Sequence, residues 1–313
     1  MLLSQLNSQD IRSRLRKGGL RLRMGDFTVQ LTTSLTGVAD GISLMYGGFP
    51  LVSEEGFADF HVSVDSPKGF RRWFRRQVLF SHDGYIPFKP LPVEHGYAQL
   101  EWGLNWCISS HCHQYLVIHA GVIEKNGYAV ILPAPPGSGK STLCAALVQR
   151  GWRLLSDELA LVSRRDGLLK PIARPVNLKN QSIDIIRAFE PTAVIGTPAK
   201  DTSKGTVAHM RAPAESIARA QESAPPAWVI FPKYEAGSAA RLSPMPKGNA
   251  FIELAESAFN YSSLGEEGFR VLADIIDNSD CYRFSYSSLD EAVAIFSTLE
   301  PRSVSGLATQ ASL

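Results

Sequence analysis

A run of six residues, 137–142, has the side chains and spacing best suited to chemistry in this sequence. It consists of Gly-Ser-Gly-Lys-Ser-Thr and follows an apolar segment. Gly139, Lys140 and Ser141 match the end of the P-loop pattern, in which Gly, four residues, Gly, Lys and Ser or Thr surround phosphate. Ala134 stands where that pattern has its first glycine. The run therefore predicts a phosphate-binding turn between a strand and a helix.

Each residue of this turn has an expected role. The backbone N–H groups are expected to surround phosphate oxygens, because the helix that follows presents its positive end there. Lys140 is expected to reach the β and γ phosphates, and the Ser141 hydroxyl to bind Mg²⁺. The alternative is a glycine-rich turn that only opens a helix, but the complete run favours ATP and Mg²⁺ as ligands. The expected nucleotide-binding residues are Gly137, Ser138, Gly139, Lys140, Ser141 and Thr142.

Two acidic residues, Asp157 and Glu158, end the strand that is predicted after this helix. Asp157 lies 17 residues after Lys140. Because neighbouring parallel strands end at one edge of a sheet, both acids are expected near the γ-phosphate and its metal. One carboxylate would hold Mg²⁺, and the other would accept a proton from an attacking hydroxyl. The alternative is a solvated acid pair at the end of a strand.

A histidine, His119, precedes Lys140 by 21 residues. Alone, it would be interpreted as a packed, hydrogen-bonded histidine. However, the order of histidine, glycine loop and acid pair in HAGVIEKNGYAVILPAPPGSGKSTL and RGWRLLSDELALV resembles the catalytic domain of HPr kinase/phosphorylase. The resemblance implies an α/β P-loop fold related to phosphoenolpyruvate carboxykinase. It places the general base at Asp157, an acid that is usually Asp at Glu158, and the phosphate and Mg²⁺ positions at Lys140 and Ser141.

The chain as a whole is more similar to the branch called HPr-kinase-related kinase A. The similarity covers most of residues 20–300 and is carried by LEWGLNWC, LLSDELALV, RPVNLKN, KGTVAH and FNYSSLG. The signature of the phosphorylase reaction is not found, and the region before His119 does not resemble the N-terminal domain of HPr kinases. The resemblance implies an ATP-dependent kinase, leaves the acceptor open and makes a homo-oligomer possible.

Two basic segments, RPVNLKN at 174–180 and KDTSKGTVAH at 200–209, could supply a cation to a developing phosphoryl charge. Both are predicted to be loops, and the alternative is that both are simply solvated. Arg174 and Lys204 are the preferred catalytic cations, because a proline follows the first and a glycine the second. The basic side chains of the two segments are Arg174, Lys179, Lys200, Lys204 and His209.

Two further clusters, one of arginines and one of histidines, are not expected to form a binding site. The segment GFRRWFRRQVLF places Arg71, Arg72, Arg75 and Arg76 around two aromatic residues. It could bind an acidic peptide or stack on RNA, but the balanced charge of the chain favours a surface strand. The sequence HCH at 111–113 is not expected to bind a metal, because adjacent side chains point to different sides of a helix or strand.

The elements around the turn predict how it is held. Strand, loop, helix and strand form a mononucleotide-binding unit, preceded by a hairpin with Asn126-Gly127 at its turn. The predicted parts are a mostly β accessory region (1–95), a P-loop kinase domain (96–300) and a frayed tail (301–313). Further predicted elements are strands at 27–31, 60–64, 152–162, 227–234 and 281–287, helices at 97–110, 249–265 and 267–278, and a last helix that a Ser288–Glu291 capping box begins.

The composition excludes several classes of protein. The 313 residues carry 32 basic and 30 acidic side chains, a net charge of +2, which predicts no nucleic-acid partner. No apolar run approaches the roughly 20 residues of a membrane helix, so no membrane partner is expected. The first residues lack the apolar core of a signal peptide, and the four scattered cysteines indicate a reducing compartment. We therefore expect a cytoplasmic protein.

These observations predict an ATP-dependent kinase that transfers the γ-phosphate to a hydroxyl, with a serine of a small protein or peptide as the expected acceptor. Residues 1–95 would help to choose that acceptor. One alternative is a small-molecule kinase on the same site. Another is a nucleotide-switched ATPase or binding module without an acceptor. A binder that has lost catalysis is a third, because Ala134 and Glu158 depart from the usual patterns.

Overall fold

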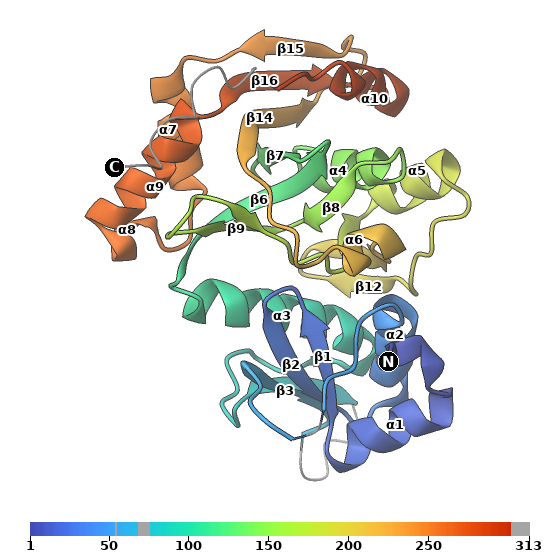
Figure 1. Cartoon of the computed structure of the whole chain (residues 1–313). Coiled ribbons are helices and arrows are strands. Elements are labelled where there is room, and N and C mark those ends of the chain that lie inside the picture. The colour runs from blue at the N-terminus through green and yellow to red at the C-terminus, as the bar shows by residue number, and fades with distance from the viewer. Residues whose placement is uncertain (54, 68–75, 302–313) are drawn as a thin grey trace.

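The computed structural model describes residues 1–53, 55–67 and 76–301. In these residues the chain is mixed α/β and forms sheets of five, eight and three strands. The helix α3 (Gly96–His111) lies between the five-stranded sheet and the rest of the chain (Figure 1). The tail that was predicted to fray begins at Pro301, the last described residue.

The N-terminal layer is a five-stranded sheet in sequence order. Strands β2 and β3 are parallel, and the other neighbours are antiparallel. The strands predicted at 27–31 and 60–64 are confirmed, and their alternate residues are buried. Arg71, Arg72 and Arg75 of the predicted arginine cluster lie outside the described residues. The elements are η1 (Leu3–Gln5), α1 (Ser8–Lys17), β1 (Leu20–Met24), β2 (Phe27–Thr32), α2 (Thr36–Tyr46), β3 (Phe60–Asp65), β4 (Gln77–His82), β5 (Leu91–Pro92) and η3 (Val93–His95).

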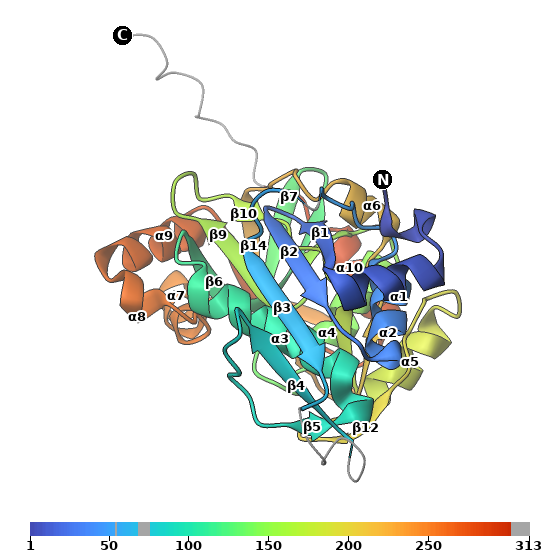
Figure 2. The same cartoon turned by 90° about the horizontal axis from the view of Figure 1, so that it is seen from below.

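Helix α3 packs directly on this sheet, along β3 and β4 (Figure 2). The close approach depends on Gly103, because a Cβ at this position would overlap the Phe80 ring. The helix matches the predicted segment 97–110 to within about one residue at each end. One buried apolar core extends from Leu3 through α3 to Phe296, so the N-terminal layer and the later elements share it.

The central sheet has eight strands in the order β10-β9-β6-β7-β14-β16-β15, and β8 also pairs with β6. Strands β7, β14 and β16 run parallel, so their carboxyl ends meet at one edge. The predicted hairpin is confirmed, since Asn126 and Gly127 have φ of 55° and 87° between β6 and β7. The strands are β6 (Tyr115–Lys125), β7 (Tyr128–Pro133), β8 (Arg153–Ser156), β9 (Leu159–Ser163), β10 (Leu169–Lys170), β14 (Pro226–Tyr234), β15 (Arg241–Pro244) and β16 (Asp280–Tyr286).

The predicted strand at 152–162 is wrong in one respect, because it is divided into β8 and β9. Both pair antiparallel with β6, and the chain bends at Asp157 and Glu158 between them. Strand β6 therefore separates β7 from β8, which were expected to be neighbours. Strands β7 and β8 still run in the same direction, so the bend lies at the edge where β7 ends.

A small three-stranded sheet, β11-β13-β12, lies beside the bend. It corrects the prediction of two basic loops: Lys179 is on β11, and Lys200 and His209 are on β12 and β13. Thr202 and Gly205 close a tight hairpin, in which the Thr202 hydroxyl donates to the Gly205 carbonyl, so that only Ser203 and Lys204 form its turn. The strands are β11 (Val176–Lys179), β12 (Ala199–Thr202) and β13 (Gly205–Met210).

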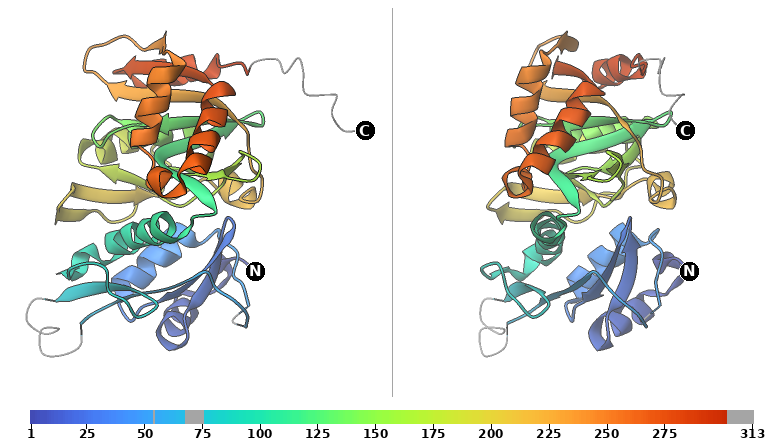
Figure 3. Two further views of the ribbon diagram at one scale, coloured as in Figure 1. Left: turned by 90° about the vertical axis from the view of Figure 1, so that its left-hand side faces the viewer. Right: turned by 60° about the vertical axis from the view of Figure 1, so that its left-hand side comes forward.

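Helices cover both faces of the central sheet. α7 and α9 lie side by side on one face (Figure 3), where they form a second apolar core with alternate residues of β6 and β7. α4 and α10 pack into the larger core on the opposite face. The helices are α4 (Lys140–Val148), α5 (Gln181–Phe189), α6 (Ala214–Ala218), α7 (Lys247–Glu256), α8 (Tyr261–Leu264), α9 (Glu266–Asp277) and α10 (Leu289–Ser297).

Two predicted C-terminal features differ in detail. The helix predicted at 249–265 is interrupted between α7 and α8, because the Asn260 side chain binds the backbone of β6 at Tyr115 and Val117. Ser288 caps α10 by accepting the Glu291 N–H, but the Glu291 carboxylate accepts the Ala240 N–H instead of closing a capping box.

Two general features of the chain follow. No described helix is both long and apolar enough to cross a membrane. The four cysteines are buried, as expected of small apolar residues.

Candidate active site

The turn before α4 has the backbone that its glycines predict. Gly137 and Gly139 have φ of 89° and 88°, a conformation that favours glycine. A Cβ on Gly139 would also lie 2.5 Å from the Tyr286 hydroxyl oxygen. Ala134 is not among the residues with positive φ, so its methyl group suits the backbone there. The missing first glycine therefore does not distort the turn.

The ends of two neighbouring strands hold this turn in place. The Tyr234 N–H, at the end of β14, donates to the Ser138 carbonyl at 2.8 Å. The Tyr286 hydroxyl, at the end of β16, donates to the Gly139 carbonyl at 3.0 Å. Within the turn, the Ser138 and Lys140 N–H groups make only long hydrogen bonds of 3.3 and 3.4 Å. A phosphate oxygen could replace these long hydrogen bonds without breaking the ones that hold the turn to β14 and β16.

Lys140 connects the turn to the acid pair. Its side chain is buried, and its Nζ donates to the backbone carbonyl of Asp157 at 2.7 Å. The side chain passes over Gly121 of β6, where a Cβ would lie 3.7 Å from the Lys140 Cγ. The bend between β8 and β9 and the start of α4 are therefore joined across β6 by one ammonium group.

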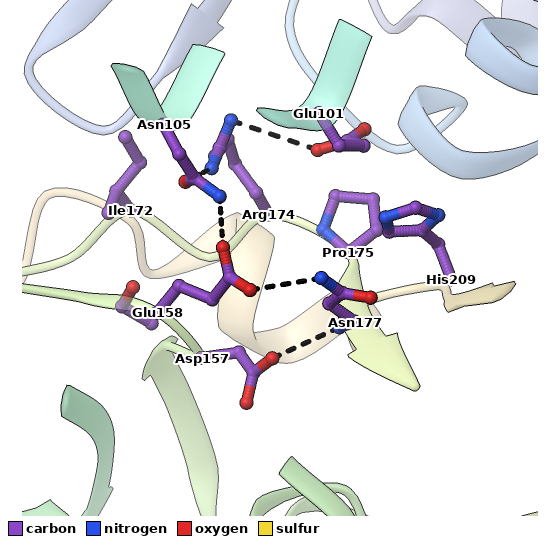
Figure 4. Close-up of a pocket in the computed structure, with 10 residues that line it drawn as sticks. Glu101, Asn105, Asp157, Glu158, Ile172, Arg174, Pro175, Asn177 and His209 are labelled. Atoms are coloured by element: carbon purple, nitrogen blue, oxygen red, sulfur yellow. Dashed lines mark hydrogen bonds and ion pairs between the residues drawn. The ribbon is translucent and has the colours of Figure 1, made fainter. Parts of the chain in front are cut away.

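The two carboxylates of the bend have different partners (Figure 4). Asp157 Oδ2 accepts the Asn177 N–H at 3.0 Å, while its buried Oδ1 has no hydrogen-bond partner among the described residues. Glu158 Oε1 accepts from the Asn177 side-chain amide at 2.9 Å, and Oε2 accepts from the Asn105 side-chain amide. The Ser141 side chain also interacts with the Asp157 carboxylate and lowers its pKa, but Oδ1 makes no hydrogen bond of good geometry, whereas both oxygens of Glu158 accept one.

The environment separates the two pKa values. Burial raises the pKa of Asp157, and the nearby Lys140 ammonium only partly offsets that effect. Burial also raises the pKa of Glu158, but Lys140, Lys179 and the Asn177 amide outweigh it and hold that pKa at about 2. Adjacent carboxyl groups with pKa values pushed apart are typical of sites that divide proton transfer from charge stabilisation.

Arg174, a predicted catalytic cation, is directed toward α3. Its guanidinium donates to Asn105 Oδ1 and lies 3.7 Å from the Glu101 carboxylate. Glu101 in turn accepts hydrogen bonds from Tyr46 and Tyr97 at 2.8 and 2.6 Å. The charge of Arg174 is therefore compensated by a buried carboxylate.

Sequence reasoning missed Glu101, Asn105 and Asn177 as site residues. A weak signal existed on α3, where Glu101 and Asn105 are four residues apart and so share one helix face. Together with residues of the bend, these side chains line a narrow pocket, which is completed by Ser156, Asp157, Glu158, Ile172, Arg174, Pro175 and His209.

The remaining predicted side chains surround this centre. Lys204 lies at the tip of the β12–β13 hairpin, with its Nζ 5.1 Å from the Trp102 ring centroid, and it contributes to the low pKa of Glu158. His209 is buried, and its ring packs edge-on against Tyr97 at 5.3 Å. His119 is on β6, and burial together with Lys140 lowers its pKa to about 4. His119 is therefore neutral at neutral pH.

The side-chain oxygen atoms beside the turn suit Mg²⁺ that is bound together with phosphate. No cluster of three or more His, Cys, Asp or Glu side chains in the described ranges could hold a metal ion by itself. Ser141 is in the first turn of α4, and the ionised Glu158 supplies hard oxygen atoms, while the unpartnered Asp157 Oδ1 remains available to accept a proton. Mg²⁺ commonly binds through one or two carboxylates, waters and substrate phosphates, so these residues fit it.

Comparison with known proteins gives limited information. No family model matches the sequence, and no curated protein matches it. Among solved structures, the HPr(Ser) kinase/phosphatase from Coxiella burnetii is a neighbour, with a TM-score of 0.26 and 11% identity. The match covers 58% of this chain and 91% of that chain. A TM-score this low does not establish a common fold.

Proposed function

We propose that this protein is an ATP-dependent kinase that transfers the γ-phosphate to a hydroxyl group, with a serine of a small protein or peptide as the acceptor. One observation carries the proposal. Lys140, at the start of α4 and directly after two left-handed glycines, extends over β6 and donates to the backbone of the acid pair. This arrangement brings the Lys140 ammonium group and a buried carboxylate to the same edge of the sheet, which supports phosphate binding beside a proton acceptor.

The proposed holding roles follow from the partners of each group. The N–H groups of residues 137–142 and the Lys140 ammonium would bind the phosphates. Ser141 and Glu158 would hold Mg²⁺, with Glu158 acting directly or through water because both of its oxygens already accept amide hydrogen bonds. When bound, Mg²⁺ would neutralise charge on the phosphate oxygens.

Asp157 is the proposed general base. Its free Oδ1 would accept the proton of the acceptor hydroxyl as that oxygen attacks the γ-phosphate. The raised pKa of Asp157 increases its proton affinity toward the value that suits a base near neutral pH. Lys204, at the tip of the β12–β13 hairpin, remains the proposed cation that stabilises the developing phosphoryl charge. Arg174 is better explained as a holding group, because Glu101 already compensates its charge.

Tracing the γ-phosphate tests this function. The protein is incubated with γ-labelled ATP, Mg²⁺ and a cell lysate that has been separated into polypeptides and metabolites. The kinase proposal predicts label on hydroxyl groups of polypeptides, and loss of that label with Asp157→Asn. Label on a metabolite would identify a small-molecule kinase. Release of inorganic phosphate alone, at the same rate with and without lysate, would support the ATPase alternative and contradict a kinase.

A further inference from the structure

Asn105 of α3 makes two hydrogen bonds that fix the direction of its side-chain amide. Its Nδ2 donates to Glu158 Oε2, and its Oδ1 accepts from the Arg174 guanidinium (Figure 4). A carboxylate accepts but cannot donate, and a guanidinium donates but cannot accept. The amide therefore has only one orientation that satisfies both partners.

Behind Asn105, the network continues into the N-terminal layer. Arg174 is 3.7 Å from Glu101, one helical turn before Asn105 on α3. Glu101 accepts from Tyr97 of the same helix and from Tyr46, a fully buried residue of α2. Hydrogen bonds and one ion pair thus connect α2, α3 and the bend that carries the acid pair.

At the other end, Glu158 is held by two amides that approach from different elements. Asn177, on β11, donates to Oε1, and Asn105, on α3, donates to Oε2. A glutamate side chain has several rotatable bonds, so one hydrogen bond leaves it free to rotate, whereas two bonds to different oxygens define its position. Among the described residues, removing Asn105 would leave Asn177 as the only side-chain amide on this carboxylate.

We propose that Asn105 is a positioning residue for Glu158, and that Arg174, Glu101 and Tyr46 anchor Asn105 to the N-terminal layer, which is thereby part of the phosphoryl-transfer site. This inference rests on the proposed kinase function and adds a second role for residues 1–95. The N-terminal layer and α3 set the geometry of the metal-binding carboxylate, in addition to any part in choosing the acceptor.

A double-mutant cycle between Asn105→Ala and Glu158→Gln tests this role. Turnover and the Mg²⁺ concentration for half-maximal rate are measured for the full-length wild type, both single variants and the double variant. Loss of a partner that orients a metal ligand typically costs about 10–100-fold in metal affinity or activity, so Asn105→Ala should do the same. In the Glu158→Gln background, Asn105→Ala should add less than about 3-fold, because the group it positions is already altered.

Two further variants separate positioning from general stability. Asn105→Asp keeps the size of the side chain but places a carboxylate against Glu158, so it should raise the Mg²⁺ requirement at least as much as Asn105→Ala. Asn260→Ala is the matched control. Asn260 is buried and hydrogen-bonds to the backbone of β6 through its side-chain amide, outside the acid pair. It should lower thermal stability and leave the Mg²⁺ requirement unchanged.

The outcomes are distinct. A folded Asn105→Ala protein with wild-type turnover and Mg²⁺ requirement would overturn the positioning role and leave the kinase proposal standing. Effects of Asn105→Ala and Glu158→Gln that multiply fully in the double variant would also overturn it, since they would show independent action. If the wild type fails to transfer phosphate to any acceptor, the proposed function itself fails and this inference with it.

Discussion

Asp157 and Glu158 are neighbours in the chain, yet their carboxylates lie in different environments. Burial dominates at Asp157 and raises its pKa, while lysines and an amide dominate at Glu158 and hold its pKa at about 2. The difference arises at the bend between β8 and β9, where the first carboxylate accepts the Asn177 N–H of β11 and the second also reaches Asn105 of α3. At the scale of single residues, this difference is the basis for the proposed roles, proton transfer at Asp157 and charge stabilisation at Glu158.

Substitution of the two acids should have opposite effects. Asp157→Asn removes the base, so phosphoryl transfer should fall by about 10²–10⁴-fold while ATP·Mg²⁺ binding changes much less. Glu158→Gln removes a charge beside the metal and should weaken Mg²⁺ binding first. Single-turnover kinetics and nucleotide titration measure the two effects separately. If Asp157→Asn abolishes metal-dependent binding and Glu158→Gln alone stops transfer, the two roles are reversed.

Ser141→Ala should change the metal dependence of nucleotide binding. The hydroxyl at this position of a P-loop binds the Mg²⁺ that bridges the phosphates. Affinity for ATP should therefore fall more in the presence of Mg²⁺ than in its absence, and fluorescence titration with and without the metal measures the difference. An equal loss under both conditions would indicate that Ser141 only opens the helix.

At the scale of elements, the ends of β14 and β16 shape the glycine turn before α4 through Tyr234 and Tyr286. Gly137 and Gly139 share a left-handed backbone, but only Gly139 lies against another side chain, because nothing is within 4 Å of a Cβ on Gly137. Alanine at position 137 would therefore add backbone strain alone, whereas alanine at position 139 would add backbone strain and a clash with β16.

Alanine at these two positions should cost different amounts of stability. Gly137→Ala adds only the strain of a left-handed residue and should lower the free energy of unfolding by about 1–2 kcal/mol. Gly139→Ala adds a clash with the Tyr286 hydroxyl, 2.5 Å from the new Cβ, and should cost more. Urea unfolding compares the two. Equal losses would mean that β16 does not confine the turn.

The elements near the turn were predictable from sequence, and their pairing was not. The hairpin, α3 and α4 have local signals, such as Asn126-Gly127 and the apolar helix after Ser141. The division of β8 from β9 depends on how both strands pair with β6, which no short pattern encodes. Similarly, the glycine turn with Lys140 and the acid pair are local motifs, whereas Asn105 reaches Glu158 from 53 residues away.

At the scale of the whole molecule, one core joins the N-terminal layer to the elements around the turn. Helix α3 contributes to both, since it packs on β3 and β4 and also presents Glu101 and Asn105 to the acid pair. The region expected to be a separate accessory part therefore shares its packing with the site. This arrangement gives the N-terminal layer a structural reason to affect chemistry at the sheet edge.

A shared core predicts cooperative unfolding. Scanning calorimetry of the full chain should show one transition, with equal calorimetric and van't Hoff enthalpies, because exposing the N-terminal layer also exposes α3. As a control, Gly103→Ala, which forces a Cβ into the Phe80 ring, should lower the temperature of that single transition. Two resolved transitions, only one of them shifted by Gly103→Ala, would contradict a common core.

Titration of ATP·Mg²⁺ into the wild type and Lys140→Ala tests the central claim most directly, because every proposed step needs phosphate bound at the start of α4. The wild type should bind, and Lys140→Ala should lose most of that affinity, since it lacks the ammonium that faces the β and γ phosphates. Lys140→Met, closer in size to lysine, should behave in the same way and controls for the lost volume. Circular dichroism should show that both variants are folded. Absence of binding by the wild type, or equal binding by a folded Lys140→Ala protein, would contradict the account.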